Sequence, residues 1–271
     1  MKSAITISIV PEARGGPFVF WDDLSAGMQT AHDLGFDAVE LFLPAPDAIP
    51  VDALRTLLDQ HKLQLAAVGT GAGWVKHRLH LCKPDAAERR KAIDFIARFL
   101  DFGAAFGAPA IIGSMQGRWE ETVSRDQALE FLAAALNELG ARAGERETVL
   151  LYEPLNRYET NLVNTVRDGV ALLKTLDNKN VKLLADLFHM NIEEPNIAES
   201  IRRGGKRIGH VHFVDSNRRA AGYGHLHFGP IIHALMDIGY QAYLSVEALP
   251  YPDSLSAAQQ TIKRFRELVK S

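Results

Sequence analysis

The chain has 271 residues, of which 47% are hydrophobic and 23% are charged, an ordinary globular composition with enough length for a large core. Its formal net charge is −3 and it has no basic stripe that would bind a phosphate backbone, so no nucleic-acid partner is expected. The single cysteine excludes an internal disulfide, no apolar run is long enough to span a membrane, and no signal peptide is recognisable, so we expect a cytoplasmic protein without a membrane partner.

Eight short apolar segments, spread over the whole chain, predict β-strands. In chain order they are Ile5–Val10, Ala38–Leu43, Gln64–Gly69, Ala110–Gly113, Thr148–Glu153, Lys182–Asp186, Ile208–Val214 and Ala242–Glu247. Most are apolar on both faces, which is typical of parallel strands that are covered by helices. The glycine-rich run 69–73, after the third strand, is interpreted as a tight loop because no helix clearly begins there.

Helical patterns lie between these strands. Ala86–Phe106 repeats apolar residues at a spacing near that of an α-helix. Ser124 followed by Gln127 predicts a capping box at the start of the next helix. Eight strand-then-helix units without a break in composition predict a closed (β/α)8 barrel, an α/β fold, which forms a single domain over residues 1–271.

Polar residues end several of the predicted strands, where chemistry collects in such a barrel. Taken singly, an acid at a strand end is better explained as a helix cap or a loop ion pair. The residues that close four successive strands would nevertheless lie side by side on one rim, and they are Glu153, Asp186, His212 and Glu247. Three carboxylates there repel each other unless a cation lies between them. Three oxygen donors and one imidazole favour Mn²⁺, Mg²⁺ or Co²⁺ over a structural zinc ion, so we predict one divalent metal ion.

Three further polar residues lie near these strand ends. His210 lies two residues before His212 in the same strand, so both point into the barrel, and His210 would orient a carboxylate. His189 follows Asp186 by three residues and would either contact substrate or be an ordinary loop histidine. Glu40 lies near the end of the second strand, and the sequence alone assigns it no role.

Five stretches of the chain carry a family resemblance. They are Glu-Pro-Leu-Asn-Arg-Tyr-Glu at 153–159, Ala-Asp-Leu-Phe-His-Met-Asn-Ile-Glu-Glu at 185–194, His-Val-His-Phe-Val-Asp-Ser-Asn-Arg at 210–218, Gly-Tyr-Gly-His at 222–225 and Ser-Val-Glu at 245–247. In combination they resemble the xylose-isomerase-like TIM barrel superfamily, in particular its D-tagatose and D-psicose 3-epimerase group. More narrowly, the first two stretches are similar to those of 5-keto-L-gluconate epimerases.

The resemblance implies an isomerase of carbohydrate metabolism that acts on a small-molecule sugar, either a ketose or a keto-sugar acid. It implies that the four strand-end residues hold the metal, with Mn²⁺ as the first choice, and that Glu153 and Glu247 also form the acid–base pair. Such an epimerase abstracts a proton next to the carbonyl through a metal-stabilised enediolate and returns a proton to the other face. Members of this group often form dimers or tetramers, so a homo-oligomer is expected.

Further residues are assigned to substrate binding. The resemblance implies that equivalents of His189 and Arg218 contact the oxygens near C1 and C2 of the sugar, and that an equivalent of Glu159 hydrogen-bonds the residue matching His210. Arg118 lies five residues past the fourth strand, on a loop that opens on the same rim. The planar guanidinium of Arg118 would suit a carboxylate at the far end of a keto-acid. The equal alternative is that Arg118 is an ordinary loop arginine that contacts only solvent.

Three other classes of function remain open. An inosose dehydratase, a hydroxypyruvate isomerase or an aldose isomerase would use similar residues, and residue types alone do not separate these from an epimerase. A DNA-repair endonuclease shares the barrel, but it needs more metal ligands and a basic face. A non-catalytic sugar-binding barrel would not need both Glu153 and Glu247, because binding alone does not require two opposed carboxylates.

Overall fold

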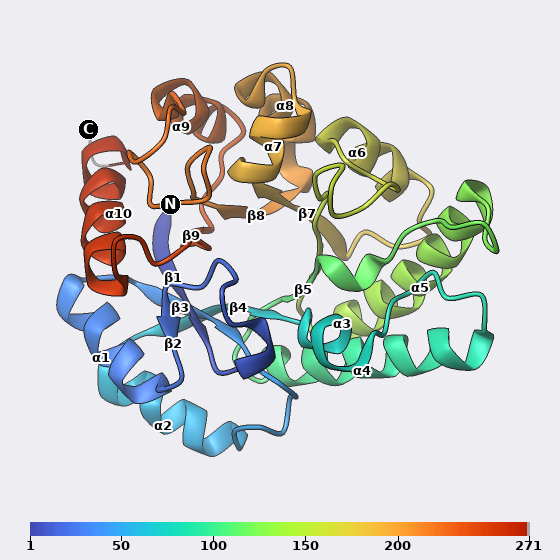
Figure 1. Cartoon of the computed structure of the whole chain (residues 1–271), viewed down its shortest axis with the longest axis horizontal. Coiled ribbons are helices and arrows are strands. Elements are labelled where there is room, and N and C mark those ends of the chain that lie inside the picture. The colour runs from blue at the N-terminus through green and yellow to red at the C-terminus, as the bar shows by residue number, and fades with distance from the viewer. Residues whose placement is uncertain (270–271) are drawn as a thin grey trace.

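A closed parallel barrel lies at the centre of the computed structural model, which describes residues 1–269 (Figure 1). Its eight strands are β1 (Lys2–Ser8), β3 (Ala38–Phe42), β4 (Gln64–Gly69), β5 (Ala110–Ile112), β6 (Leu150–Tyr152), β7 (Val181–Asp186), β8 (Ile208–His212) and β9 (Tyr243–Val246). Each strand pairs in parallel with the next, and β1 closes the barrel by pairing with β9, with Ala4 opposite Ser245 and Ile5 opposite Val246. The predicted α/β barrel is therefore confirmed.

Helices follow the strands and surround the barrel (Figure 1). The α-helices are α1 (Leu24–Leu34), α2 (Val51–His61), α3 (Ala72–His77), α4 (Ala86–Ala104), α5 (Arg125–Glu145), α6 (Val166–Lys174), α7 (Leu187–Glu193), α8 (Ile197–Gly204), α9 (Phe228–Asp237) and α10 (Ser254–Val269), and the 3-10 helices are η1 (Pro11–Ala13), η2 (Ser114–Gln116) and η3 (Gly205–Arg207). The predicted capping box is confirmed, because Ser124 and Gln127 each accept a hydrogen bond from the other's backbone N–H. None of the helices within residues 1–269 is long and apolar enough to cross a membrane.

The inside of the barrel is filled by apolar side chains beneath a polar rim. Leu151 and Leu184 lie two residues before Glu153 and Asp186, so they share the inward face of their strands. They are fully buried and form a small cluster with Ile111 that is separate from the main core between strands and helices. This packing closes the barrel from below, so the polar side chains of the rim face only one opening.

The structure differs from the prediction in two connections. The run 69–73 is not only a loop, because α3 begins at Ala72 within it; the residue at its N-cap, Gly71, has no side chain that could have signalled the start. A two-residue strand, β2 (Phe20–Trp21), pairs with Ile7 and Ser8 of β1. Two residues are too few to show a periodic pattern, and only the distant partner strand identifies them.

Candidate metal centre and substrate cleft

Glu153 follows β6 directly, and its side chain points into the barrel mouth. Its backbone N–H donates to the carbonyl oxygen of Ile112 at 3.0 Å, which fixes the residue beside β5. A β-carbon at Gly113 would lie 2.6 Å from Glu153 Oε2, so this inward position requires glycine at the neighbouring strand end. Glu153 Oε1 is buried and has no hydrogen-bond partner within residues 1–269. A buried carboxylate oxygen is costly without a partner, and a cation would provide one.

Asp186 ends β7 and also caps the helix that follows. Its Oδ1 accepts hydrogen bonds from the backbone N–H groups of Phe188 at 2.7 Å and His189 at 3.2 Å. These bonds fix the carboxylate at the N-terminus of α7, where the helix dipole favours a negative charge. The other oxygen, Oδ2, is left to face the barrel mouth, where it lies 3.0 Å from His212 Nδ1.

Three carboxylates converge on one nitrogen of His212, the last residue of β8. From Nδ1 the distance is 3.0 Å to Asp186 Oδ2 and 3.6 Å to both Glu153 Oε1 and Glu247 Oε2. The structure thus brings together the four residues that the sequence placed on one rim. Candidate ligand atoms of Glu153, Asp186 and His212 all lie within 4.8 Å of one another. Glu247 lies outside that closest group, and its Oε2 also accepts a hydrogen bond from Arg218 Nη2 at 2.8 Å.

The chemistry of this donor set fits a divalent ion. Carboxylate oxygens with one imidazole nitrogen suit Mn²⁺ or Mg²⁺ and leave room for further oxygen ligands. Burial raises the pKa of Glu153 to about 8. The neighbouring carboxylates of Glu247 and Asp186 also raise this pKa, whereas His212 lowers it. Burial also raises the pKa of Glu247. A cation among these groups would relieve both the desolvation and the repulsion, and it would favour their ionised forms.

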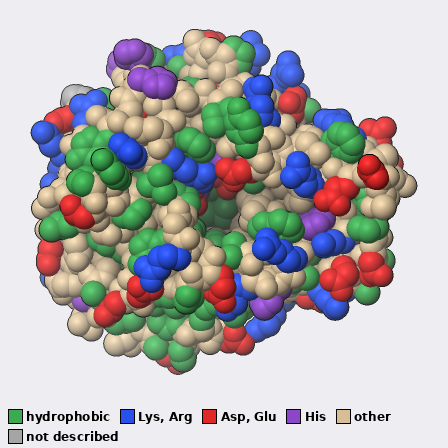
Figure 2. Space-filling model, in the orientation of Figure 1, with side chains coloured by type: hydrophobic (Ala, Val, Ile, Leu, Met, Phe, Trp, Pro, Cys, Tyr) green, Lys and Arg blue, Asp and Glu red, His purple; other side chains and the backbone are tan. Residues whose placement is uncertain are grey.

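The cluster borders two connected spaces at the barrel mouth. A small inner cavity of about 70 Å³ is lined by Glu153, His212 and Glu247 among others. A larger space of about 300 Å³, called the cleft below, shares Glu153 and Glu247 with it and is also lined by Phe18, Trp74 and Arg218. Figure 2 shows the hollow on the face where the barrel opens, with hydrophobic side chains inside it and charged ones around it. The volume of the cleft is near the lower limit of about 300 Å³ for sites of small ligands.

Comparison with known proteins identifies the family of this barrel. The family model described as "Xylose isomerase-like TIM barrel" matches residues 28–268. The chain belongs to the xylose isomerase-like TIM barrel family. It is 31% identical to a D-psicose 3-epimerase of Agrobacterium fabrum over 260 residues, which are 94% of this chain and 86% of that protein.

Two further proteins are similar to this chain. A 3-dehydro-D-guloside 4-epimerase of Escherichia coli is 36% identical over 129 residues, 45% of this chain and 48% of that protein. A crystal structure of a D-psicose 3-epimerase in the presence of D-fructose superposes with a TM-score of 0.83 over 100% of both chains at 23% identity, which supports the fold. The named sequence relatives are epimerases, so the expectation of an isomerase-type enzyme is confirmed at that level.

Glu40 is a residue of this site to which the sequence assigned no role. The resemblance implied Glu159 as the partner of His210, but in the structure His210 Nε2 lies 2.8 Å from Glu40 Oε2. The other oxygen of Glu40, Oε1, lies 3.2 Å from His212 Nε2. A glutamate within the otherwise apolar strand 38–42 was the only signal in the sequence, and it did not indicate which residues Glu40 would contact.

The position of Glu40 determines which ring nitrogen of His212 faces the carboxylate cluster. Glu40 is 4% exposed and His210 and His212 are each 1% exposed, so water does not compete for these contacts. Burial alone would raise the pKa of Glu40, but the imidazoles of His212 and His210 hold it well below its usual range. An ionised Glu40 accepts a hydrogen bond from Nε2–H of His212. In the neutral ring Nδ1 is then unprotonated and can act as a ligand.

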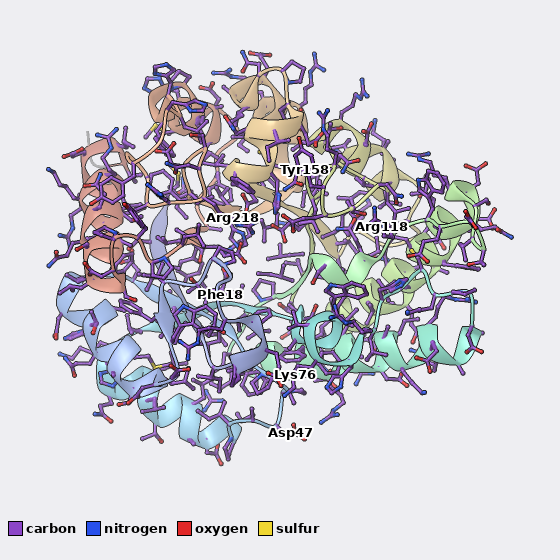
Figure 3. All side chains as sticks on the ribbon, viewed as in Figure 1. Phe18, Asp47, Lys76, Arg118, Tyr158 and Arg218 are labelled. Carbon is purple, nitrogen blue, oxygen red and sulfur yellow. The ribbon has the colours of Figure 1, made fainter. Side chains whose placement is uncertain are left out.

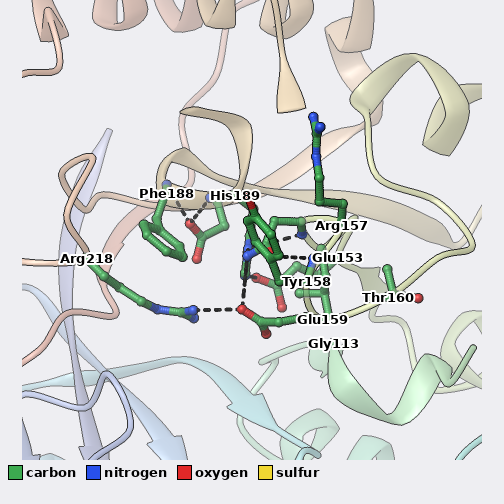
Figure 4. Close-up of polar contacts among 12 residues, drawn as sticks. Gly113, Glu153, Arg157, Tyr158, Glu159, Thr160, Phe188, His189 and Arg218 are labelled. Atoms are coloured by element: carbon green, nitrogen blue, oxygen red, sulfur yellow. Dashed lines mark hydrogen bonds and ion pairs between the residues drawn. The ribbon is translucent and has the colours of Figure 1, made fainter. Parts of the chain in front are cut away.

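His189, Arg218 and Glu159 form a network beside the four-residue cluster (Figure 4). Arg218 donates from Nη1 to Glu159 Oε1 at 3.2 Å and from Nη2 to Glu247 Oε2 at 2.8 Å, so its guanidinium bridges the two carboxylates. His189 Nε2 lies 3.7 Å from Glu153 Oε1 and has no hydrogen-bond partner within the described chain. All three residues line the cleft, which places them where the sequence predicted substrate contacts.

Unlike the other predicted substrate-binding residues, Arg118 does not line the cleft, and it lies to the right of Arg218 in Figure 3. It is exposed, and its guanidinium has no hydrogen bond or ion pair with any of residues 1–269. It lines a third space of about 280 Å³, called the outer cavity below, together with Trp74 and Glu159. These two residues also line the cleft, so the outer cavity adjoins it. Contact between Arg118 and a substrate therefore stays a prediction.

Proposed function

We propose that this protein is a metal-dependent sugar epimerase that acts on an unphosphorylated ketose or keto-sugar acid. The observation that carries the proposal is the convergence of Glu153, Asp186 and Glu247 on His212 Nδ1, at 3.0 to 3.6 Å, next to a cleft. The relatives named above, a D-psicose 3-epimerase and a 3-dehydro-D-guloside 4-epimerase, support the same class of reaction.

Glu153 and Glu247 are the proposed acid and base. They follow β6 and β9, which are separated around the barrel by β7 and β8, so they approach a molecule in the cleft from different sides. One carboxylate takes the proton from the carbon next to the carbonyl, and the bonding pair left behind moves toward the carbonyl oxygen. The other, protonated, returns a proton to the opposite face of that carbon. A bound divalent ion would supply Lewis-acid stabilisation of the charge on the oxygen.

The remaining residues hold the substrate and the acid–base pair in place. Arg218, which bonds both Glu159 and Glu247, fixes Glu247 and offers a positive charge to substrate oxygens in the cleft. Burial lowers the pKa of His189, so its ring is neutral at pH 7. Its Nδ1 accepts a hydrogen bond from the backbone N–H of Asn156, so Nε2 carries the proton and can donate to a substrate oxygen. Phe18 and Phe42 stack with ring centroids 4.5 Å apart and form an apolar wall of the cleft that limits access of water.

The test is proton exchange on a panel of ketoses and keto-acids in D₂O with Mn²⁺, followed by NMR. Epimerisation predicts deuterium at the carbon whose configuration changes, next to the carbonyl. Proton transfer between C1 and C2 of the sugar would instead identify an aldose–ketose isomerase. Absence of exchange on every member of the panel, with metal bound, would reject the proposal.

Arg118 provides the means to decide between a ketose and a keto-acid. A carboxylate at the far end of the sugar would meet its unpaired guanidinium in the outer cavity. The ratio of kcat/KM for a keto-acid and for its neutral counterpart should then fall about 10-fold to 100-fold in Arg118→Ala. An unchanged ratio would leave Arg118 as a surface residue and favour the neutral ketose.

A further inference from the structure

The outer cavity adds to the cleft a space of similar size that does not contain the reacting carbon. It measures about 280 Å³, against about 300 Å³ for the cleft. Four residues line both spaces, and they are Trp74, Ser114, Leu155 and Glu159. A molecule whose reacting carbon lies beside Glu153 and Glu247 can therefore extend past these residues into the outer cavity.

Aromatic side chains form part of the outer cavity. Trp74, in α3, is half-buried and has His80 edge-on beside it, with ring centroids 5.7 Å apart. Tyr158, in the loop after β6, exposes 78% of its surface, the largest fraction among the exposed large hydrophobic residues. Figure 3 shows Tyr158 at the barrel mouth, between the positions of Arg218 and Arg118. Aromatic rings with a polar edge are suited to contact a ligand that has an apolar face and polar groups.

The polar groups of the outer cavity have both signs of charge. Arg118 and Glu120 have no side-chain hydrogen bond or ion pair with any of the described residues, so both are free to meet a ligand. Glu159 brings a second carboxylate. A carboxylate of the substrate, bound by Arg118 alone, would face these two acids and fill only part of the space. A ring with several hydroxyl groups can donate to Glu120 and Glu159 and accept from Arg118.

We propose that the outer cavity is a subsite for a second ring that is rich in hydroxyl groups. The substrate would then be a keto-glycoside, with its oxidised sugar in the cleft and a glycosyl or cyclitol ring in the outer cavity, whether or not it also carries a carboxylate. This inference rests on the proposed function for the reaction in the cleft. It adds Tyr158, Trp74 and Glu120 as residues that determine substrate specificity.

The kinetic test compares a keto-disaccharide with the corresponding methyl keto-glycoside, which lacks the second ring, in the metal-loaded enzyme. Deuterium exchange should give a kcat/KM that is about 10-fold higher for the disaccharide, the scale of one good aromatic contact. Tyr158→Ala and Glu120→Gln should lower this preference. Tyr223→Ala is the matched control, because Tyr223 is another exposed tyrosine at 39% and it lines neither space.

A binding measurement separates the subsite from the reaction. Saturation-transfer NMR with the unoxidised disaccharide should show contact of its second ring with the wild type and with Tyr223→Ala, and weaker contact with Tyr158→Ala. Exchange on small ketoses without any preference for a second ring would overturn the subsite and leave the proposed function intact. Contact of the second ring without exchange on any substrate would support the subsite and reject the proposed reaction. Equal contact in all variants would overturn the role of Tyr158 and with it the subsite.

Discussion

Glu40 contacts His212 at Nε2, the ring nitrogen that faces away from the carboxylate cluster, with Oε1 of Glu40 at 3.2 Å from it. The second oxygen of Glu40 is occupied by His210 at 2.8 Å, so the carboxylate cannot turn away without losing a buried contact. The ring of His212 is therefore fixed with Nδ1 toward Asp186, Glu153 and Glu247. Glu40 is in this sense a positioning residue.

We expect Glu40→Gln to weaken metal binding by about 10-fold to 100-fold, the usual cost of removing a partner of a ligand histidine. The amide has one acceptor oxygen for two imidazoles, so one histidine loses its acceptor. Metal affinity would be measured by competition with a chelator. Glu130→Gln is the control, since Glu130 is exposed on α5. Equal affinities of the folded variants would remove Glu40 from this role.

Asp186→Asn should separate the two functions of that residue. Asparagine caps a helix about as well as aspartate, so α7 and the melting temperature should change little. The negative charge is lost, so the variant should retain much less Mn²⁺ after dialysis than the wild type, as measured by metal analysis. Asp23→Asn, at the exposed N-cap of α1, is the control that should keep full metal content. Wild-type metal content in Asp186→Asn would contradict the ligand assignment.

Glu153→Gln and Glu247→Gln should each lose roughly 10²-fold to 10⁴-fold in turnover, because each removes one member of the acid–base pair. The loss can be larger, since both residues are also predicted metal ligands. The metal content of each preparation is therefore measured beside the rate of deuterium exchange. A variant with bound metal and a near-normal rate would exclude that glutamate from proton transfer.

Arg218→Lys should raise KM and lower kcat/KM, by about 10-fold to 100-fold, while metal content is retained. Lysine cannot reach both Glu159 and Glu247 as the guanidinium fork does, with its contacts of 3.2 and 2.8 Å. The neighbouring Arg219→Lys serves as the control, because Arg219 stacks on the ring of Tyr251 at 3.7 Å and does not line the cleft. Loss of metal in Arg218→Lys would show that the arginine supports the metal centre instead.

Cys82 should resist alkylation in the folded protein. Its thiol donates to the carbonyl oxygens of Gln116 and Ala128, and burial raises its pKa to about 12. The thiolate is the reactive form, and only about one thiol in 10⁴ is ionised at pH 8, so alkylation is slow and becomes faster as the pH approaches the pKa. Mass spectrometry after treatment with iodoacetamide should show slow labelling of the native protein and rapid labelling in urea. Equal rates would contradict the burial of this residue.

The sequence predicted the barrel well because parallel strands covered by helices are apolar on both faces. It placed the start of β1 too late, at Ile5 instead of Lys2, because Lys2 and Ser3 are polar. Both have partners that only the folded chain provides. Ser3 is bonded to Asp37, and the ammonium of Lys2 lies 5.7 Å from the centroid of the Tyr243 ring.

The candidate site was predicted less completely than the fold. Strand ends are local features, so Glu153, Asp186, His212 and Glu247 were found from their spacing in the chain. The partners of Glu40 are 170 and 172 positions away, and no local pattern specifies such a contact. Of the residues that line the outer cavity, only Arg118 and Glu159 were predicted as site residues, because the cavity is assembled by segments that follow β4, β5 and β6.

Closure of the barrel by β1 and β9 has a consequence for how an active molecule first arises. The hydrogen bond from Thr6 Oγ1 to the carbonyl oxygen of Val246 joins residues 240 positions apart, so this seam forms only when nearly the whole chain has been synthesised. Until then β1 and β8 each expose an edge that can pair with another chain. Glu247 comes directly after β9, and the step that removes those edges therefore also delivers the last carboxylate to the cluster. We therefore expect turnover to recover during refolding only when β9 has paired with β1 and β8, and a nascent chain without this strand to be inactive and prone to aggregate.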